Sequence, residues 1–177
     1  FKPFKKKDFI IKTSDIRAQL DNLPHKSQTF SFGKSIPNRW VAVGDSNSSN
    51  SIFYSSDGIN FIPVSNSNNI FSTAGNGVAW SGTRWIAVGR GNYSIAYSSD
   101  GQSWTGATDA NENNIFNNGG YGVASNGTRW VAVGYGNMRS IVYSDDDGIN
   151  WTDATYMNGN DTKSLFSTKG NGVAWNG

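Results

Sequence analysis

The chain of 177 residues contains no cysteine, a single histidine and a single glutamate. The lack of cysteine excludes a disulfide scaffold, a zinc finger and a thiol nucleophile. Neither His25 nor Glu112, which lies in an Asn-rich segment, has the neighbours expected of a catalytic triad or a carboxylate pair. No apolar run approaches the roughly 18 residues that a membrane-spanning helix requires. We therefore expect no catalytic residue, no metal site, no cofactor and no membrane span.

Small polar residues and aromatic residues are abundant instead. The chain has 22 Asn, 23 Ser and 21 Gly, which are typical of turns, while seven Trp, seven Tyr and ten Phe argue against disorder. The net charge of +2 comes from residues 1–38, which carry eight Lys or Arg and three Asp. We predict a basic N-terminal arm over 1–38, with a short helix over 13–23 and a possible first strand over 29–32. Its lysine cluster at 5–7 is expected to keep the arm soluble and to contact nucleic acid weakly at most.

An internal repeat organises the rest of the chain. The pattern Arg-Trp-(Val/Ile)-Ala-Val-Gly occurs at 39–44, 84–89 and 129–134, with a spacing of 45 residues. Each copy is followed by Ser-Ile-x-Tyr-Ser, then by Asp-Gly and an aromatic residue, and finally by Gly-Val-Ala. A period of this length is typical of propellers, solenoids and other repeat arrays.

The local chemistry of the repeat favours a β-propeller. Each copy contains four short β-prone runs, Ser81-Gly82 and Asn126-Gly127 suit hairpin turns, and no segment after residue 38 has a helical period. We predict an all-β fold over 39–177, a β-propeller of four-stranded antiparallel blades with repeats starting at 39, 84 and 129. A lone strand at 172–175 is expected to begin a fourth blade.

Two questions about this architecture stay open. A β-solenoid is the alternative fold, although its coils are usually shorter than 45 residues and lack such hairpins. Because closed propellers usually have four to eight blades, we expect these repeats to belong to a larger ring or to one assembled from several chains.

One turn of the third repeat resembles a known motif. Residues 144–151, Ser-Asp-Asp-Asp-Gly-Ile-Asn-Trp, resemble the Asp-box or BNR repeat, Ser-x-Asp-x-Gly-x-x-Trp, of sialidases, sortilin-type receptors and many other propellers. The resemblance implies a structural role for Ser144, Asp146, Gly148 and Trp151: the carboxylate accepts turn N–H groups, the glycine takes a positive φ and the tryptophan packs between strands. A calcium site at residues 145–147 is not expected, because one turn offers no second set of ligands.

The other two repeats depart from the Asp-box. Residues 54–58 and 97–101 are one residue shorter between serine and glycine, and we interpret Ser56 and Ser99 as occupying the aspartate position. The wider pattern is similar to uncharacterised repeat proteins encoded by giant DNA viruses and some bacteria.

A sialidase-like activity is the main enzymatic alternative, and the residues disfavour it. Resemblance to sialidases would imply an arginine triad, a Tyr–Glu nucleophile pair and an aspartic acid. Arg39, Arg84 and Arg129 occupy the same place in each repeat, so we predict that they are spread around a ring as packing residues. Residues 35–37, Ser-Ile-Pro, also lack the arginine of the sialidase Arg-Ile-Pro motif.

Residues that differ between repeats are the ones available for binding. We expect the loops after the second strand and between the repeats to lie at one end of the sheets. The candidate binding residues on these loops are Arg90, Asn92, Tyr93, Tyr135, Met138 and Arg139. Exposed Tyr, Arg and Met are typical of protein and glycan contacts.

These patterns predict a non-catalytic binding or structural module. Its expected partners are other protein chains: further blades, copies of itself, or a capsid or scaffold protein. The resemblance to viral repeat proteins favours a virion or a cell surface over the cytoplasm. A carbohydrate-binding or sialidase-like propeller is the alternative.

Overall fold

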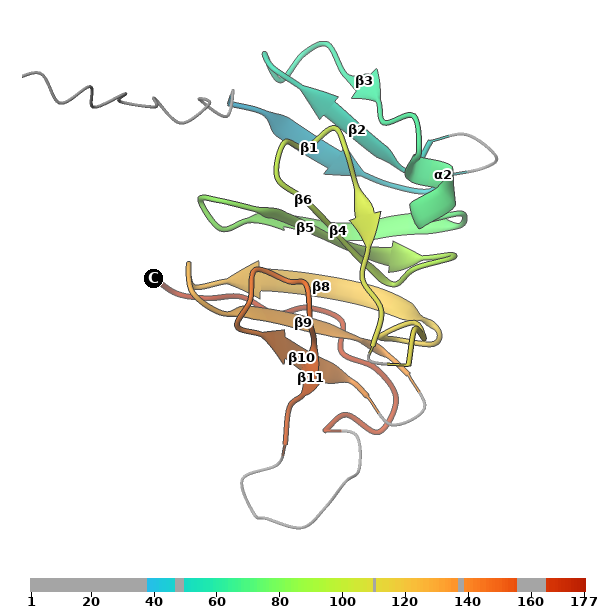
Figure 1. Cartoon of the computed structure of the whole chain (residues 1–177), viewed down its shortest axis with the longest axis vertical. Helices are drawn as coiled ribbons and strands as arrows, with labels where there is room; N and C mark the ends of the chain where they lie inside the picture. Colours follow the sequence, from blue (N-terminus) through green and yellow to red (C-terminus); the bar gives the residue numbers. More distant parts are fainter. Residues whose placement is uncertain (1–37, 47–49, 110, 137–138, 156–164) are drawn as a thin grey trace, which may run out of the picture. The chain divides into compact units, whose positions relative to one another are not determined.

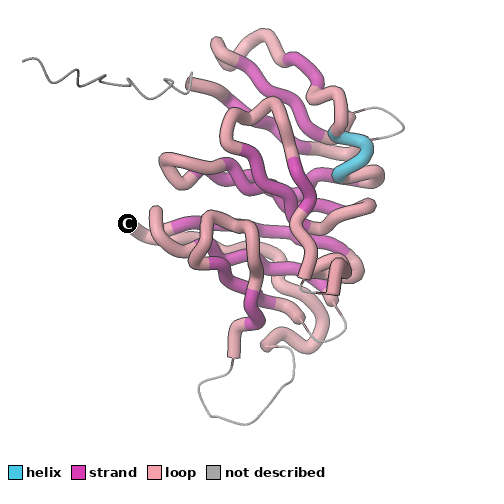
Figure 2. Tube along the Cα trace, in the orientation of Figure 1, coloured by secondary structure: helices cyan, strands magenta, loops and turns pink. Residues whose placement is uncertain are grey.

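A computed structural model describes residues 38–46, 50–109, 111–136, 139–155 and 165–177. These residues belong to one unit, Ile36–Gly177, and are all-β apart from one helical turn (Figures 1 and 2). The expected helix over 13–23 and the strand over 29–32 lie outside the described residues.

Three antiparallel sheets follow one another along the chain (Figure 1). The first sheet contains β1 (Trp40–Val43), β2 (Ile52–Ser55) and β3 (Ile62–Pro63). The second contains β4 (Ala74–Trp80), β5 (Trp85–Arg90), β6 (Ile95–Ser98) and β7 (Thr105–Gly106). The third contains β8 (Gly119–Ser125), β9 (Trp130–Tyr135), β10 (Ile141–Ser144) and β11 (Thr152–Asp153). The prediction of an all-β fold built from antiparallel sheets is confirmed; the second and third sheets have the four expected strands, and the first has three described strands.

The strands differ from the sequence prediction in two details. β4 begins at Ala74 rather than at Gly77, because a β-bulge between Gly75 and Gly77 lets the ladder with β5 continue, and β8 has the same irregularity. A helical turn, α2 (Ser67–Ile70), lies between β3 and β4, where no helix was expected. Four residues are too few to show a helical period.

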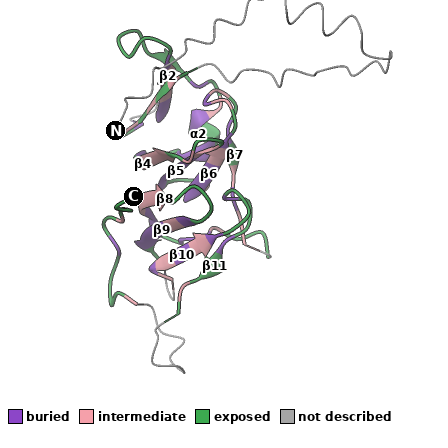
Figure 3. Cartoon of the chain, turned by 90° about the vertical axis from the view of Figure 1, so that its left-hand side faces the viewer, coloured by how far each residue is buried: buried purple, intermediate pink, exposed green. Residues whose placement is uncertain are grey.

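The sheets stack face to face through two hydrophobic clusters (Figure 3). Neighbouring residues of β5 point to opposite sides: Ala87 joins the cluster shared with the first sheet, while Ile86 and Val88 join the cluster shared with the third. Trp104 fills the first of these clusters and Trp130 the second. The second sheet is therefore buried on both faces.

The last described segment, residues 165–177, docks on the third sheet. The Gly170 N–H donates to the Gly134 carbonyl at 3.0 Å, as the Gly75 N–H donates to the Gly44 carbonyl at 2.9 Å. Residues 172–175 do not form the expected lone strand. A strand needs a neighbour for its N–H and C=O groups, and no described strand pairs with this segment.

Candidate binding surfaces

In the turn after β10, side chains of the turn accept hydrogen bonds from backbone N–H groups of the same turn. The Ser144 hydroxyl donates to Asp146 Oδ1 at 2.8 Å and accepts the Gly148 N–H at 3.0 Å. Asp146 Oδ1 accepts the Asn150 N–H at 2.9 Å, and Gly148 has a φ of 78°. Trp151 donates its indole N–H to the Gly148 carbonyl at 3.0 Å and is 9% exposed. Ser144, Asp146, Gly148 and Trp151 thus all interact within the turn and its strands.

The two shorter turns have the same hydrogen bonds between serine, aspartate and backbone N–H groups. Asp57 Oδ1 accepts the Ser55 hydroxyl and the N–H groups of Ile59 and Asn60, each at 2.8 Å, and Asp100 does the same after β6. The interpretation that Ser56 and Ser99 occupy the aspartate position is therefore wrong. The shorter turns lack the residue between aspartate and glycine, which in the third turn is Asp147 with a φ of 62°. The three turns share the order Ser-x-Asp from their first residue, so Asp57, Asp100 and Asp146 align when the turns are matched at the serine.

The capping hydrogen bonds stabilise the charged form of each aspartate. The N–H and side-chain amide of Asn60 hold the pKa of Asp57 well below its usual value, with help from Ile59 and Ser55. Burial raises the pKa of Asp146, but the hydrogen bonds from Asn150 and Ser144 outweigh it and the pKa is lowered. The pKa of Asp100 is lowered by the same balance. These carboxylates are ionised and already bound to their own turns.

The repeated arginines each lie on a tyrosine of their own sheet. The pairs are Arg39 over Tyr54, Arg84 over Tyr97 and Arg129 over Tyr143, at 5.0, 5.3 and 4.9 Å from guanidinium carbon to ring centroid. Arg129 also forms a two-point ion pair with Asp145, at 2.6 and 2.9 Å. Each arginine is thus held by a tyrosine of its own sheet, and Arg84 Nε also lies 4.0 Å from Asp147 in the turn after β10.

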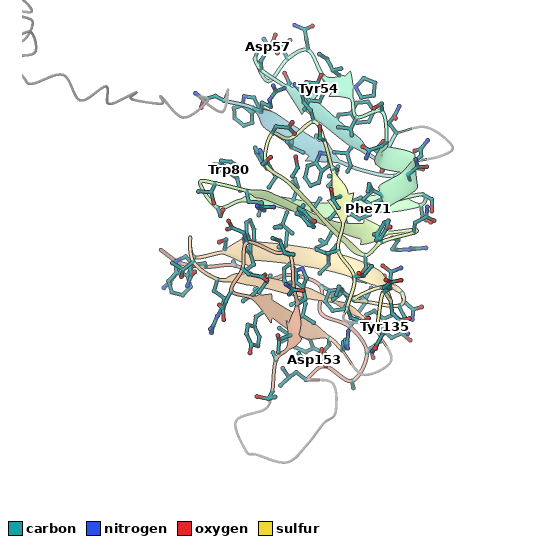
Figure 4. The ribbon with its side chains drawn as sticks, viewed as in Figure 1. Tyr54, Asp57, Phe71, Trp80, Tyr135 and Asp153 are labelled. Carbon is teal, nitrogen blue, oxygen red and sulfur yellow. The ribbon has the colours of Figure 1, made fainter. Side chains whose placement is uncertain are left out.

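Loops from successive repeats meet at one end of the sheets, which we call the loop surface. The Asn92 side chain donates to the Asn69 carbonyl at 3.3 Å, and the Asn114 side chain donates to the Asn92 carbonyl at 2.9 Å. Asn114 Oδ1 also accepts the Ser94 N–H at 2.7 Å. In Figure 4 Tyr135 lies at this end and Trp80 at the opposite end. Interlocked amides therefore hold the loops of different repeats together.

Three polar cavities open on the loop surface, and Asn114 lines all of them. Their volumes are about 260, 370 and 530 Å³. Asp109 and Arg139 line the smallest, and Arg139 pairs with Asp109 at 3.4 Å and with Asp153 at 3.0 Å. Arg90, which forms no ion pair among the described residues, lines the second cavity. The second and third cavities share Asn92 and Tyr93.

The predicted loop residues have different places on this surface. Arg90, Asn92, Tyr93 and Arg139 line the cavities. Tyr135 ends β9 and is 37% exposed, outside the described cavity linings, and Met138 lies outside the described residues. The sequence reasoning missed the lining residues Asn69, Asn114 and Asn117, because Asn-rich loops carry no spacing that marks which amides meet.

The outer face of the first sheet is a second candidate surface, formed by Trp40, Ala42, Phe53 and Phe61. Trp40 and Phe61 are 63% and 43% exposed. Their counterparts in the third sheet, Trp130 and Trp151, are 1% and 9% exposed because they pack on the second sheet. The first sheet therefore presents to solvent the residue types that the repeat buries elsewhere.

Comparisons with models of protein families and with curated proteins found no match. Within the described residues, no group of three or more His, Asp or Glu side chains is arranged to hold a metal ion. The described part of the chain also has no helix long and apolar enough to cross a membrane.

Proposed function

We propose that this chain is a non-catalytic β-propeller module that binds other protein chains. Support comes from the successive antiparallel sheets that stack face to face with β4 and β8 in contact, because propeller blades stack in a similar way. The described sheets do not close on themselves, so the proposal includes further sheets, supplied by the same polypeptide or by another chain. The proposed setting is a virion or a cell surface, and purified particles without peptides of this chain would argue against the virion.

The observation that carries this proposal is the exposure of Trp40. At one position of the repeat, the tryptophan is 63% exposed in the first sheet and 1% exposed in the third. Exposed apolar patches mark interaction sites, and tryptophan is enriched among the residues that dominate binding energy. A protein surface that covers this face would complete the packing found between the other sheets.

A photo-crosslinker at position 40 tests the proposal. Benzoylphenylalanine replaces Trp40 in one variant and Ile59, which is 82% exposed on a turn of the same sheet, in the control. In cells or particles that contain the chain, we expect position 40 to form protein adducts and position 59 to form few. If position 40 gives no protein adduct above the control, the proposed function is wrong.

Glycan binding is a second candidate function, and the loop surface favours it. Its cavities combine side-chain amides, the Tyr93 ring and the guanidinium of Arg139, which together can bind hydroxyl groups and an apolar sugar face. A glycan array is the test: specific binding that Arg90→Ala or Arg139→Ala abolishes would favour this candidate. Hydrolysis of a reporter glycoside would instead indicate an enzyme.

A further inference from the structure

The described residues include a second copy of the β4 sequence that pairs with no described strand, and the described first sheet has no strand at the place that β4 takes in the second. Residues 166–175 repeat residues 71–80 with one difference, Lys169 in place of Ala74. In the earlier copy this sequence forms β4 and pairs with β5, whereas residues 172–175 pair with no described strand. The first sheet has three strands, and no described strand lies at the edge of β1 where β4 and β8 border β5 and β9.

We infer that residues 172–175 of one copy of this chain pair with β1 of a second copy. The donated segment becomes the fourth strand of the second copy's first sheet. This inference rests on the proposed function, because it names the protein partner: a second copy of the chain.

The repeat fixes the register of the new ladder. Trp80 lies opposite Trp85, and Val78 lies opposite Ala87. At the equivalent positions, Trp175 lies opposite Trp40 of the second copy, and Val173 lies opposite its Ala42. The β1 edge and the donated segment then satisfy each other's backbone groups, which is how exposed sheet edges recruit further chains.

The exposed tryptophans support this register. The rings of Trp80 and Trp85 lie 5.0 Å apart between centroids. Trp175 and Trp40 are 58% and 63% exposed, and the donated strand brings them together as the same pair. Aromatic pairs of this kind stabilise neighbouring strands beyond the area that they bury.

The third sheet has a vacant place for Trp40 of the second copy. The cluster between the second and third sheets contains Trp130 and Ile86, and Ala79 and Val123 pack against it. The residues equivalent to the last three of these are Val131, Ala124 and Val173, and they line a cavity of about 250 Å³. When the second copy docks its first sheet on this face, its Trp40 fills that cavity.

The contact joins two different surfaces, so it is head-to-tail. Each copy donates at residues 172–175 and accepts at β1, and repeated addition produces a ring or an open chain. Destroying the donor end leaves the acceptor end of the same molecule intact, and the reverse also holds.

Complementation between two variants tests the head-to-tail contact. Ala174→Pro removes the donor-segment N–H that faces β1, as the Ala79 N–H faces β5, and Trp40→Asp places a charge on the acceptor face. Neither residue is buried in the described chain, so each variant should keep the circular dichroism spectrum and melting temperature of the dilute wild type. Ile59→Ser, an exposed apolar residue outside the contact, is the control.

We expect the wild type and Ile59→Ser to self-associate with concentration in analytical ultracentrifugation. Each single variant should associate at least about tenfold more weakly, as expected for an interface tryptophan or a lost ladder bond. An equimolar mixture of the two variants should form a dimer, because one intact donor and one intact acceptor remain. A wild type that stays monomeric at about 100 μM would overturn the inference.

Introduced cysteines test the register in this cysteine-free chain. Ala42→Cys mixed with Val173→Cys should form a disulfide-linked dimer, whereas Ala42→Cys mixed with the off-register control Ser167→Cys should not. Equal yields in the two mixtures would overturn the inference. So would adducts from position 40 to the N-terminal residues 1–37 of the same copy, or to an unrelated protein. Adducts to an unrelated protein would still leave a protein-binding surface at Trp40. Adducts only to the arm of the same copy, or no protein adduct at all, would remove the proposed function as well.

Discussion

At the scale of single residues, three aspartates accept the same set of hydrogen bonds in three equivalent turns. Asp57, Asp100 and Asp146 each accept a serine hydroxyl and backbone N–H groups from the residues that follow. A turn of this kind leaves N–H groups without a strand partner, and a carboxylate is their strongest local acceptor. The serine and aspartate of these turns therefore close the hairpins of the chain.

Asp146→Ala should destabilise the fold, while Asp145→Ala should not. The first change removes the acceptor of the Ser144 hydroxyl and the Asn150 N–H, and should lower the free energy of unfolding by about 1–2 kcal/mol. Asp145 lies next to it in sequence but only pairs with Arg129 in solvent. Urea denaturation of the two variants measures the difference, and equal losses would contradict the structural role of Asp146.

The lowered pKa values predict how stability depends on pH. Because folding lowers the pKa of Asp57, Asp100 and Asp146 below the ordinary value of 3.8, the folded state binds protons less readily than the unfolded state. Their contribution is complete above the unfolded pKa and disappears as pH falls through the folded pKa.

We expect a stability plateau between about pH 5 and 7 and a decline below about pH 4. Urea denaturation across this range measures it. Asp100→Asn should flatten part of the decline, because its side chain no longer titrates, whereas Asp145→Asn should flatten it less. A decline of unchanged steepness in Asp100→Asn would show that other groups cause it.

At the scale of the elements, the sequence predicted the hairpins better than their limits. The β-prone runs and Asp-Gly turns located the strands of all three sheets, because alternation and turn residues are local signals. The bulge that extends β4 back to Ala74 and the single turn of α2 depend on contacts with other loops. Such contacts leave no period in the sequence.

The glycine that ends each Arg-Trp repeat provides a test of element packing. A Cβ at Gly134 would lie 2.5 Å from the Phe116 ring and 2.6 Å from the Gly119 carbonyl oxygen, whereas a Cβ at the equivalent Gly44 would meet nothing within 4 Å. Gly134→Ala should therefore cost about 1–3 kcal/mol through overpacking. Thermal or urea unfolding should show almost no loss for Gly44→Ala, and a similar loss at both sites would contradict this packing.

At the scale of the whole molecule, the repeat determines stacking as well as strands. A period of 45 residues predicted several similar sheets, and alternate residues of β5 that pack on different neighbours show how one sheet serves two clusters. The cavities of the loop surface were less predictable. Asn92 and Asn114 are 22 residues apart, and only the stacked sheets bring their loops together.

The three repeat tryptophans should have very different effects on stability although they occupy one sequence position. Trp130→Ala opens a cavity in a packed cluster where the side chain is 1% exposed, so it should cost about 3–5 kcal/mol. Trp85, which is partly buried against the first sheet, should give an intermediate loss. Trp40→Ala should change the stability of the dilute chain by less than about 0.5 kcal/mol, because that side chain is 63% exposed. Urea denaturation at low protein concentration measures all three.

Raising the protein concentration should separate Trp40→Ala from the wild type, since only the wild type gains stability from an associating partner. A large loss from Trp40→Ala in the dilute chain would mean that this face is already covered within one copy.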